Sequence, residues 1–184
     1  NIKMKKFIIL RILPKLKYPF QFKQNTKFLD IGCGNGENIH YWSDKYSVNN
    51  LKSYVKHVYA IEPSETAFDD INLTSDRKKK FLESFDDIKF DHIRMNWSLE
   101  HVHKPSEYFS YISKYLAEDG KFLLCIPNYD GIIYKIDPAN VEVPIHLYHF
   151  TQSTIKKYCD KNKLKIDFIK TFSYPGMYYF SSLV

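Results

Sequence analysis

Residues 27–37 read KFLDIGCGNGE, and this stretch decides the fold. It begins as a short apolar strand, passes through Asp30 into a turn with three glycines, and ends where a helix would start. Gly32, Gly34 and Gly36 allow the backbone to take positive φ angles and to approach a ligand without a Cβ in the way. A strand followed by a glycine-rich turn and a helix is typical of the nucleotide-binding corner of an α/β sheet.

Two details of this stretch argue against a dinucleotide ligand. The glycine spacing is Gly-x-Gly-x-Gly rather than Gly-x-Gly-x-x-Gly, and Asp30 lies just before the turn. A carboxylate there would repel a pyrophosphate, which needs bare N–H groups at a helix N-terminus. It would suit a cation instead, and S-adenosylmethionine carries an ammonium and a sulfonium group but no phosphate.

The stretch therefore resembles motif I of the class I S-adenosylmethionine-dependent methyltransferases. The resemblance implies a Rossmann-like α/β fold, with a mostly parallel, twisted seven-stranded sheet, an antiparallel last strand and helices on both faces. It also implies that Asp30, Gly32, Cys33 and Gly34 contact the cofactor, with Asp30 and the glycines at its methionyl end. Cys33 has a steric explanation as well, because a small side chain fits inside such a turn. The alternation of strand and helix signals along the chain supports an α/β fold independently.

Residues 57–64, HVYAIEPS, predict a second strand that ends at Glu62. A carboxylate at this position can accept hydrogen bonds from both hydroxyls of a ribose. The segment looks like motif II of the same family, which gives Glu62 that role. The alternative is a carboxylate that is merely exposed at a strand end, and the preceding motif I favours the ribose contact.

The third strand is the weakest part of the resemblance. Families of this type usually have a third strand that ends in an acid, which holds the adenine amino group. Here only residues 81–82 resemble a strand, and the charged run at 76–80 is predicted to be a solvated helix face or loop. Glu83, Asp86 and Asp87 are equal candidates for the adenine contact.

Residues 89–102, KFDHIRMNWSLEHV, predict the fourth strand and the loop that follows it. The patterns FD-x-I and LEHV strongly resemble motif IV of methyltransferases of the ubiquinone-pathway and sugar-modifying type. Ligands of open α/β sheets bind beyond the carboxyl ends of the strands, where the strand order reverses. We therefore expect residues 96–99 to line the methionyl group and the reacting methyl, with Asn96 among the cofactor contacts.

His101 in this loop has two interpretations. As a general base it would take a proton from an acceptor hydroxyl during O-methylation. As a structural residue it would cap or pin the loop after the strand. Glu100, His101 and His103 could also suggest a metal ion, but no further carboxylate stands at the position of Asn96, so we expect no metal.

The second half of the chain continues the alternation of helices and strands. Pro105 suits the first position of a helix, and Thr151 suits the N-cap of the last helix. Residues 121–128 are predicted to form a buried strand, residues 164–173 the sixth strand and residues 177–183 the seventh.

The run HLYHFT at 146–151 resembles the segment before the last helix in bacterial glycan-modifying methyltransferases. In a loop beside the cleft, His146, Tyr148 and His149 could contact the acceptor. Equally, they could form an aromatic anchor at the start of the helix.

The composition bounds the domain organisation. The chain has 184 residues, of which 44% are hydrophobic and 26% charged, and this predicts one globular domain. We expect a basic helical cap over 1–22, and a methyltransferase domain over 23–184 that can stop short of a complete last hairpin. The cap would cover the cofactor cleft, or alternatively lie on a membrane as a cationic amphipathic helix. Cys33, Cys125 and Cys159 lack metal or redox spacing, which favours a reducing cytoplasm.

The predicted reaction is transfer of the methyl group of S-adenosylmethionine to a hydroxyl of a small molecule, for example a sugar of a surface glycan. The net charge of +6 selects no partner, and neither a basic domain nor a base-stacking motif points to nucleic acid. The non-enzymatic alternative is a degenerate or truncated domain that binds the cofactor or a protein partner only. Asp30 and Glu62 argue against it, because both would be needless charges in an empty cleft.

Overall fold

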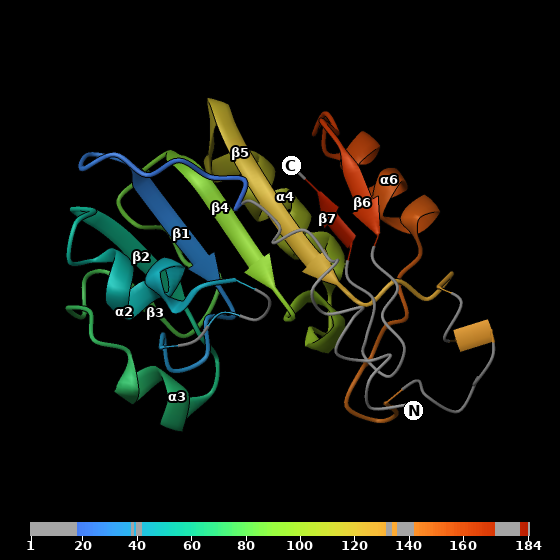
Figure 1. The fold of residues 1–184 in the computed structure, drawn as a ribbon, viewed down its shortest axis with the longest axis horizontal. Helices are drawn as coiled ribbons and strands as arrows, with labels where there is room; N and C mark the ends of the chain where they lie inside the picture. The colour runs from blue at the N-terminus through green and yellow to red at the C-terminus, as the bar shows by residue number, and fades with distance from the viewer. Residues whose placement is uncertain are drawn as a thin grey trace, which may run out of the picture.

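The computed structural model describes residues 18–37, 39, 42–131, 134–135, 142–171 and 181–183. Its strands form one sheet in the order β3-β2-β1-β4-β5-β7-β6 (Figure 1). The strands are β1 (Lys27–Ile31), β2 (His57–Ile61), β3 (Lys78–Lys79), β4 (Phe90–Asn96), β5 (Leu116–Ile126), β6 (Ile169–Thr171) and β7 (Ser181–Leu183). The helical segments are η1 (Asp44–Tyr46), α2 (Val48–Leu51), α3 (Glu65–Asp70), η2 (Leu99–His101), α4 (Pro105–Tyr115) and α6 (Gln152–Lys161).

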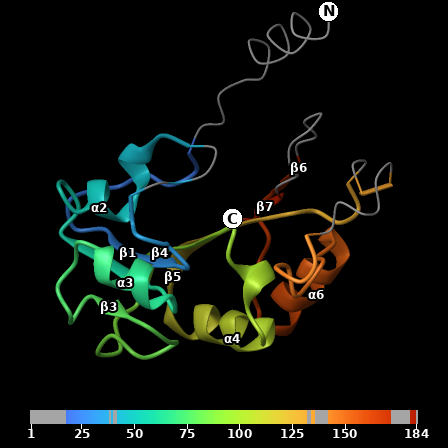
Figure 2. The same cartoon turned by 90° about the horizontal axis from the view of Figure 1, so that it is seen from below.

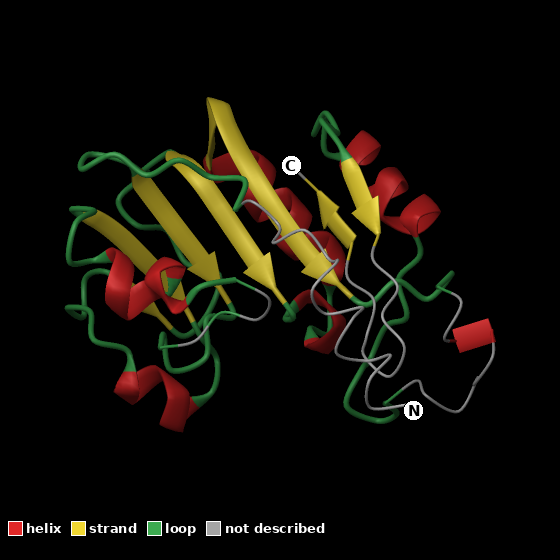
Figure 3. Ribbon diagram, viewed as in Figure 1, coloured by secondary structure: helices red, strands yellow, loops and turns green. Residues whose placement is uncertain are grey.

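The sheet is mostly parallel. Strands β1 to β5 run in one direction, whereas β7 is antiparallel to both of its neighbours, β5 and β6 (Figure 3). The chain moves outward from β1 through β2 to β3 and then returns to place β4 on the other side of β1. The carboxyl ends of β1 and β4 therefore meet where the strand order reverses, which is the ligand-binding edge of such sheets. The predicted Rossmann-like α/β fold is confirmed.

Both faces of the central strands are covered. Helices α4 and α6 lie on one face and α2 on the other (Figure 2). Alternate residues of β1 enter different apolar clusters: Leu29 and Ile31 pack with Phe109 of α4, and Phe28 packs with Leu51 of α2. Burial on both faces explains why β1 is a nearly continuous apolar run in the sequence.

The two helix starts that the sequence predicts are confirmed. Pro105 occupies the first turn of α4. Thr151 is the N-cap of α6, and its Oγ1 accepts a hydrogen bond of 3.2 Å from the N–H of Thr154. Both starts depend on chemistry within a few residues, which a sequence displays directly.

The prediction for the third strand is wrong. β3 lies at Lys78–Lys79, inside the charged run, and residues 81–82 are not in a strand. The strand pairs with the edge of β2, where the N–H of Glu62 donates to the carbonyl of Lys79 at 3.0 Å. An edge strand can consist of lysines because their long side chains extend away from the sheet.

Strand β5 starts earlier than predicted, at Leu116 and not at residue 121, so Gly120 lies inside the strand. A Cβ on Gly120 would come within 2.9 Å of the Phe90 carbonyl, so glycine allows β5 to pass close to β4 at its irregular start. β6 and β7 cover only parts of the predicted sixth and seventh strands, and residues 172–180 lie outside the described part of the chain.

The segment after the glycine turn also differs from the predicted helix. The described residues between the turn and β2 form two short helices, η1 and α2, while positions 38, 40 and 41 lie outside the description. The ring of Tyr46, at the end of η1, stacks on the ring of Tyr18 with centroids 4.0 Å apart.

The expected basic cap at 1–22 falls mostly on residues 1–17, which lie outside the described residues, and so does the membrane contact considered for it. Residues 18–22 form no helix and pack against the sheet through aromatic rings. Phe20, for example, stacks on His92 of β4 with centroids 4.3 Å apart. No helix among the described residues is long and apolar enough to cross a membrane.

Candidate active site

The glycine turn after β1 is held against the end of β2 and the loop after β4. The N–H of Gly32 donates to the carbonyl of Ile61 at 2.7 Å, and the hydroxyl of Ser98 donates to the carbonyl of Ile31 at 3.0 Å. Gly32 has a φ of +74°, and a Cβ at this position would lie 2.4 Å from the Cβ of Ser98. Position 32 therefore requires glycine on both conformational and steric grounds.

Glu62 is tied to the same turn. Its carboxylate accepts hydrogen bonds from the N–H of Gly34 at 2.8 Å and from the N–H of Ser64 at 2.9 Å, and the residue is 7% exposed. Two backbone donors thus fix its orientation, while each carboxylate oxygen can still accept a further bond. The geometry is compatible with the predicted ribose contact.

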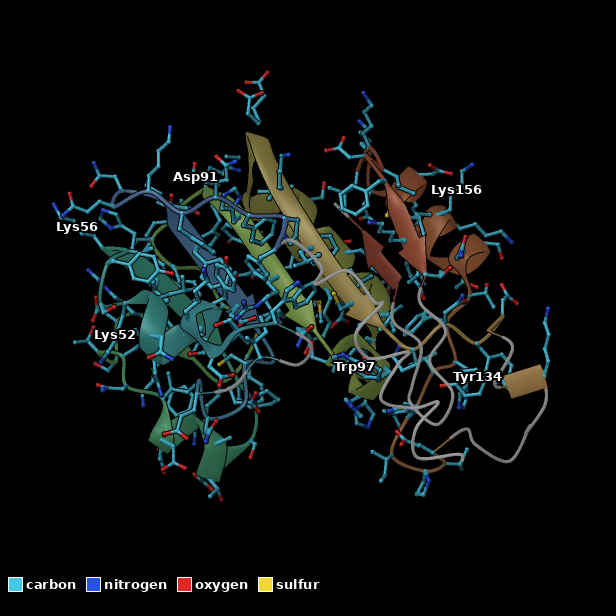
Figure 4. All side chains as sticks on the ribbon, viewed as in Figure 1. Lys52, Lys56, Asp91, Trp97, Tyr134 and Lys156 are labelled. Atoms are coloured by element: carbon cyan, nitrogen blue, oxygen red, sulfur yellow. The ribbon has the colours of Figure 1, made fainter. Side chains whose placement is uncertain are left out.

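Two adjoining cavities lie beyond the carboxyl ends of β1, β2 and β4. The methionyl-side cavity, so named from the predicted cofactor position, has a volume of about 370 Å³, and the adenosine-side cavity about 670 Å³. Both are lined by Gly32, Gly34, Trp97 and His101. Trp97 stands at the carboxyl end of β4 with a φ of +54° (Figure 4). The two cavities therefore form the two halves of one cleft.

Asp30 lines the methionyl-side cavity but forms a buried ion pair. Arg94 of β4 donates from Nε to Oδ1 of Asp30 at 3.0 Å and from Nη2 to Oδ2. Its Nη1 donates to the hydroxyl of Tyr18 at 2.6 Å and to the carbonyl of Tyr46 at 2.9 Å. Burial disfavours the charge of Arg94, but the carboxylate of Asp30 outweighs this and raises the pKa of Arg94. The wall therefore carries both charges, and not the single negative charge that Asp30 alone suggests.

Sequence reasoning missed Arg94. The signal that could have revealed it is a charged residue between Ile93 and Met95 in the middle of a strand with an otherwise buried pattern. A guanidinium that is 1% exposed needs a carboxylate partner, and the acid that precedes the glycine turn on the neighbouring strand is the available one.

Cys33 and Asn96 also line the methionyl-side cavity. Burial raises the pKa of the Cys33 thiol, with further contributions from the carboxylates of Asp30 and Glu62, so Cys33 stays a neutral thiol. Its Sγ donates to the carbonyl of Gly34 at 3.4 Å. The buried Oδ1 of Asn96 has no hydrogen-bond partner among the described residues, so it can accept a bond from a ligand.

The three acids considered for the adenine contact, Glu83, Asp86 and Asp87, line neither cavity. Phe81 lines the adenosine-side cavity instead, and 66% of this large apolar residue is exposed. An exposed aromatic ring at the edge of a cavity is a suitable stacking surface for a base. Sequence reasoning did not consider Phe81 for this contact because it assigned residues 81–82 to a strand.

His101 lies where the two halves of the cleft meet, next to Glu100. Its Nδ1 is 3.0 Å from the carbonyl of Ile145, so Nδ1 carries the proton and Nε2 is the acceptor. Nε2 lies 4.0 Å from Oε1 of Glu100. Glu100 is 1% exposed, and burial, assisted by the charge of Glu142, raises its pKa to about 8.

The loop before α6 brings His146 to this cluster. Its ring centroid lies 4.9 Å from that of His101, and its Nε2 lies 3.0 Å from Oε2 of Glu142. Burial lowers the pKa of His146, so the ring is neutral at pH 7. Tyr148 and His149 line neither cavity, and the hydroxyl of Tyr148 instead donates to the carbonyl of His103 at 2.9 Å. Only His146 of that trio lines the cleft, and Tyr148 anchors the loop.

Comparison with known proteins agrees with this geometry. The sequence model of a family described as a methyltransferase domain matches residues 3–167. An S-adenosylmethionine-dependent methyltransferase from Clostridium acetobutylicum superposes with a TM-score of 0.63 at 16% identity, covering 99% of this chain and 90% of that one. A second such enzyme, from Mesorhizobium loti, gives 0.60 at 15% identity, with 96% and 95% covered.

Magnesium protoporphyrin IX methyltransferase from Synechocystis, solved with bound S-adenosylhomocysteine, gives a TM-score of 0.59 at 16% identity, covering 86% of this chain and 74% of that one. A search of curated proteins found no significant match. The structural likenesses support the fold, and the family match spans most of the chain. The chain therefore belongs to the methyltransferase-domain family, and it is an enzyme that uses S-adenosylmethionine as its cofactor.

Proposed function

We propose that this methyltransferase transfers the methyl group to a hydroxyl oxygen of a small molecule, with a glycan sugar as the favoured acceptor. The observation that carries the proposal is the position of His101, which lines both halves of the cleft. The carbonyl of Ile145 holds its Nδ1–H, which leaves Nε2 to accept a proton. A base at the junction of the two cavities is what transfer to a hydroxyl requires.

The adenosine part of the cofactor occupies the larger cavity in this proposal. The carboxylate of Glu62 accepts hydrogen bonds from the ribose hydroxyls, and the ring of Phe81 stacks on the adenine. The backbone bonds from Gly34 and Ser64 support the first assignment, because they preorient the carboxylate.

The methionyl part carries one ammonium and one carboxylate, and it lies along the glycine turn at Gly32 and Gly34. The ion pair of Asp30 and Arg94 offers a charge of each sign to this zwitterion. Asp30 attracts the ammonium, Arg94 attracts the carboxylate, and Oδ1 of Asn96 accepts a further bond from the ammonium. Cys33 provides apolar contact in the same wall.

The reaction is an in-line displacement at the methyl carbon. A lone pair of the acceptor oxygen forms the new O–C bond while the C–S bond breaks. The electron pair of that bond stays on sulfur, so the sulfonium becomes the neutral thioether of S-adenosylhomocysteine. The hydroxyl proton passes to Nε2 of His101 and then to water. The cleft contributes mainly by positioning the two reactants and excluding water.

The methionyl-side cavity is also lined by three residues of the loop before α6, namely Glu142, Ile145 and His146. Carboxylate and imidazole groups suit the hydroxyls of a sugar. The fold does not choose the acceptor, because a solved enzyme of similar fold from Mycobacterium tuberculosis is named a cyclopropane synthase. The three cysteines are free thiols, which is compatible with the cytoplasmic location that we also propose.

Calorimetric titration with S-adenosylmethionine, with NAD as the control, tests the cofactor assignment. We expect a Kd on the order of micromolar for S-adenosylmethionine and none for NAD. Transfer of a labelled methyl group to panels of sugars, phenols, amines and carboxylic acids then tests the acceptor. Label should appear on hydroxyl oxygens only, and His101→Gln should abolish transfer while cofactor binding persists. Label on amines alone, or binding without transfer to any acceptor, would contradict the proposal.

A further inference from the structure

Three side chains from two distant segments converge beside the methionyl-side cavity. Glu100 and His101 follow β4, and His146 comes from the loop before α6. Each offers one ligand atom, and these atoms lie within 4.8 Å of one another. We propose that Glu100, His101 and His146 bind a divalent transition-metal ion. This revises the expectation from the sequence, which weighed His103 in place of His146 and predicted no metal.

Glu100 gives the strongest reason for a ligand. It is 1% exposed, and neither carboxylate oxygen has a hydrogen-bond partner among the described residues. Buried carboxyl groups are otherwise hydrogen-bonded or paired, because a buried polar group without a partner is costly. A bound cation would remove this cost. The nearest partner atom, Nε2 of His101, is 4.0 Å away, and that gap can be bridged by an ion.

The surroundings of the histidines match those of metal ligands. A metal-bound imidazole almost always donates its other N–H to a carbonyl or carboxylate, which fixes the ring. Nδ1 of His101 is 3.0 Å from the carbonyl of Ile145, and Nε2 of His146 is 3.0 Å from the carboxylate of Glu142. Both supporting groups come from the loop before α6, so this loop closes the site.

The donor set selects the kind of ion. Two imidazoles with one carboxylate form a common catalytic Zn²⁺ site, and the same set suits Co²⁺ or Fe²⁺ but not Mg²⁺. Bonds of about 2.1 Å place tetrahedral ligands about 3.4 Å apart, so the three atoms, which lie within 4.8 Å of one another, must approach by up to about 1.4 Å. The side chain of His101 can make this movement, because 40% of it is exposed.

The site would act on the methyl acceptor, and this role rests on the proposed function. His101 and His146 line the methionyl-side cavity, so an open coordination position faces the space where the acceptor binds. The ion would bind the acceptor hydroxyl and lower its pKa, so that the proton leaves to water before the oxygen attacks the methyl carbon. Nε2 of His101 is then a ligand, so with the ion bound the ion takes over the task that the proposed function gives to the free imidazole, while the methyl donor and the hydroxyl acceptor stay the same.

Metal binding itself can be measured without any methyl transfer. The purification tag is removed from the full chain, and bound metal is then removed with EDTA. The chain is titrated calorimetrically with Zn²⁺ and Co²⁺, with Mg²⁺ as comparison. We expect one Zn²⁺ or Co²⁺ per chain, no binding of Mg²⁺, and visible absorption of the Co²⁺ complex. Glu100→Gln and His146→Gln should each weaken binding at least tenfold. His103→Gln is the matched control, because His103 lies in the same loop but outside the cluster, and it should bind like the wild type.

Circular dichroism checks that each variant is folded. If either variant is not, the wild-type chain still tests the site, since Co²⁺ should shift the ring protons of two histidines in its NMR spectrum. Absence of stoichiometric binding, equal affinity in Glu100→Gln, or loss of binding in His103→Gln would overturn the site. Stoichiometric binding without transfer to any hydroxyl would support the site and contradict the proposed function. If methyl transfer in the presence of EDTA is as fast as transfer with the metal bound, the catalytic role of the ion is overturned.

Discussion

The two halves of the cleft are held together by different kinds of contact. In the adenosine half, backbone N–H groups of Gly34 and Ser64 fix the carboxylate of Glu62. In the methionyl half, the pair of Asp30 and Arg94 joins side chains that are 64 positions apart in the sequence. A backbone N–H is present whatever residue occupies its position, whereas the ion pair needs both of its side chains. The proposed ribose contact of the adenosine half therefore depends on backbone geometry, and the proposed methionyl contacts of the other half depend on two particular side chains.

The largest effect should come from breaking the ion pair of the methionyl half. Arg94→Met leaves the carboxylate of Asp30 buried without its partner, and we expect a loss of about 3–5 kcal/mol in the free energy of unfolding. Urea denaturation measures it. The double variant Asp30→Asn with Arg94→Met should recover part of the loss, because it removes the stranded charge. A loss of less than about 1 kcal/mol in the single variant would mean that apolar packing holds this half.

The adenosine half should respond in affinity more than in stability. Glu62→Gln replaces charged hydrogen bonds to the ribose by neutral ones, and we expect S-adenosylmethionine to bind about 10- to 100-fold more weakly. Calorimetry measures the change. Glu65→Gln is the control, because Glu65 pairs with Lys80 on the exposed side of α3 and lines neither cavity. An equal effect of the two substitutions would show that net charge, and not the position of Glu62, sets the affinity.

A smaller change should follow from Phe81→Ala. Loss of stacking on the adenine should weaken cofactor binding about five- to tenfold, in line with about 1 kcal/mol for an aromatic contact. Phe168→Ala removes another exposed ring, which is 41% exposed and lines neither cavity, and the affinity of this variant should equal that of the wild type. If Phe81→Ala also binds normally, the adenine does not stack there.

The smallest effect concerns pH and His92, which lies outside the cleft. Burial lowers the pKa of His92 below its ordinary value of 6.5, so the unfolded chain binds the proton more readily than the folded chain. The contribution of His92 to the free energy of unfolding should therefore fall as the pH drops below about 6.5, while Glu100, whose pKa is raised to about 8, contributes in the opposite direction. His92→Gln keeps a donor for the carbonyl of Gln21 and removes the His92 contribution, so the difference in stability between the two proteins, measured by denaturation curves, should change between pH 7.5 and 5.5. If the stabilities of the wild type and His92→Gln change with pH in the same way, the effect does not come from His92.

The sequence was sufficient for the features that local chemistry determines. The glycine turn, the carboxylate at the end of β2 and the starts of α4 and α6 each depend on a few adjacent residues. β3 was misplaced because its strand character comes from pairing with the edge of β2, and two lysines carry no apolar signal. Arg94 and the partnership of His101 with His146 were missed because only the folded sheet brings those segments together.

The two-residue strand β3 also bears on how this protein behaves at high concentration. It forms one border of the sheet, and an open border with unpaired backbone groups can recruit a strand from another molecule. Here the border consists of Lys78 and Lys79, and the ammonium of Lys78 donates to the carbonyls of Phe68 and Ile71 at 2.8 and 3.1 Å. A short, positively charged border of this kind disfavours edge-to-edge aggregation. The charged run that hid the strand from sequence reasoning thus also protects the molecule from self-association.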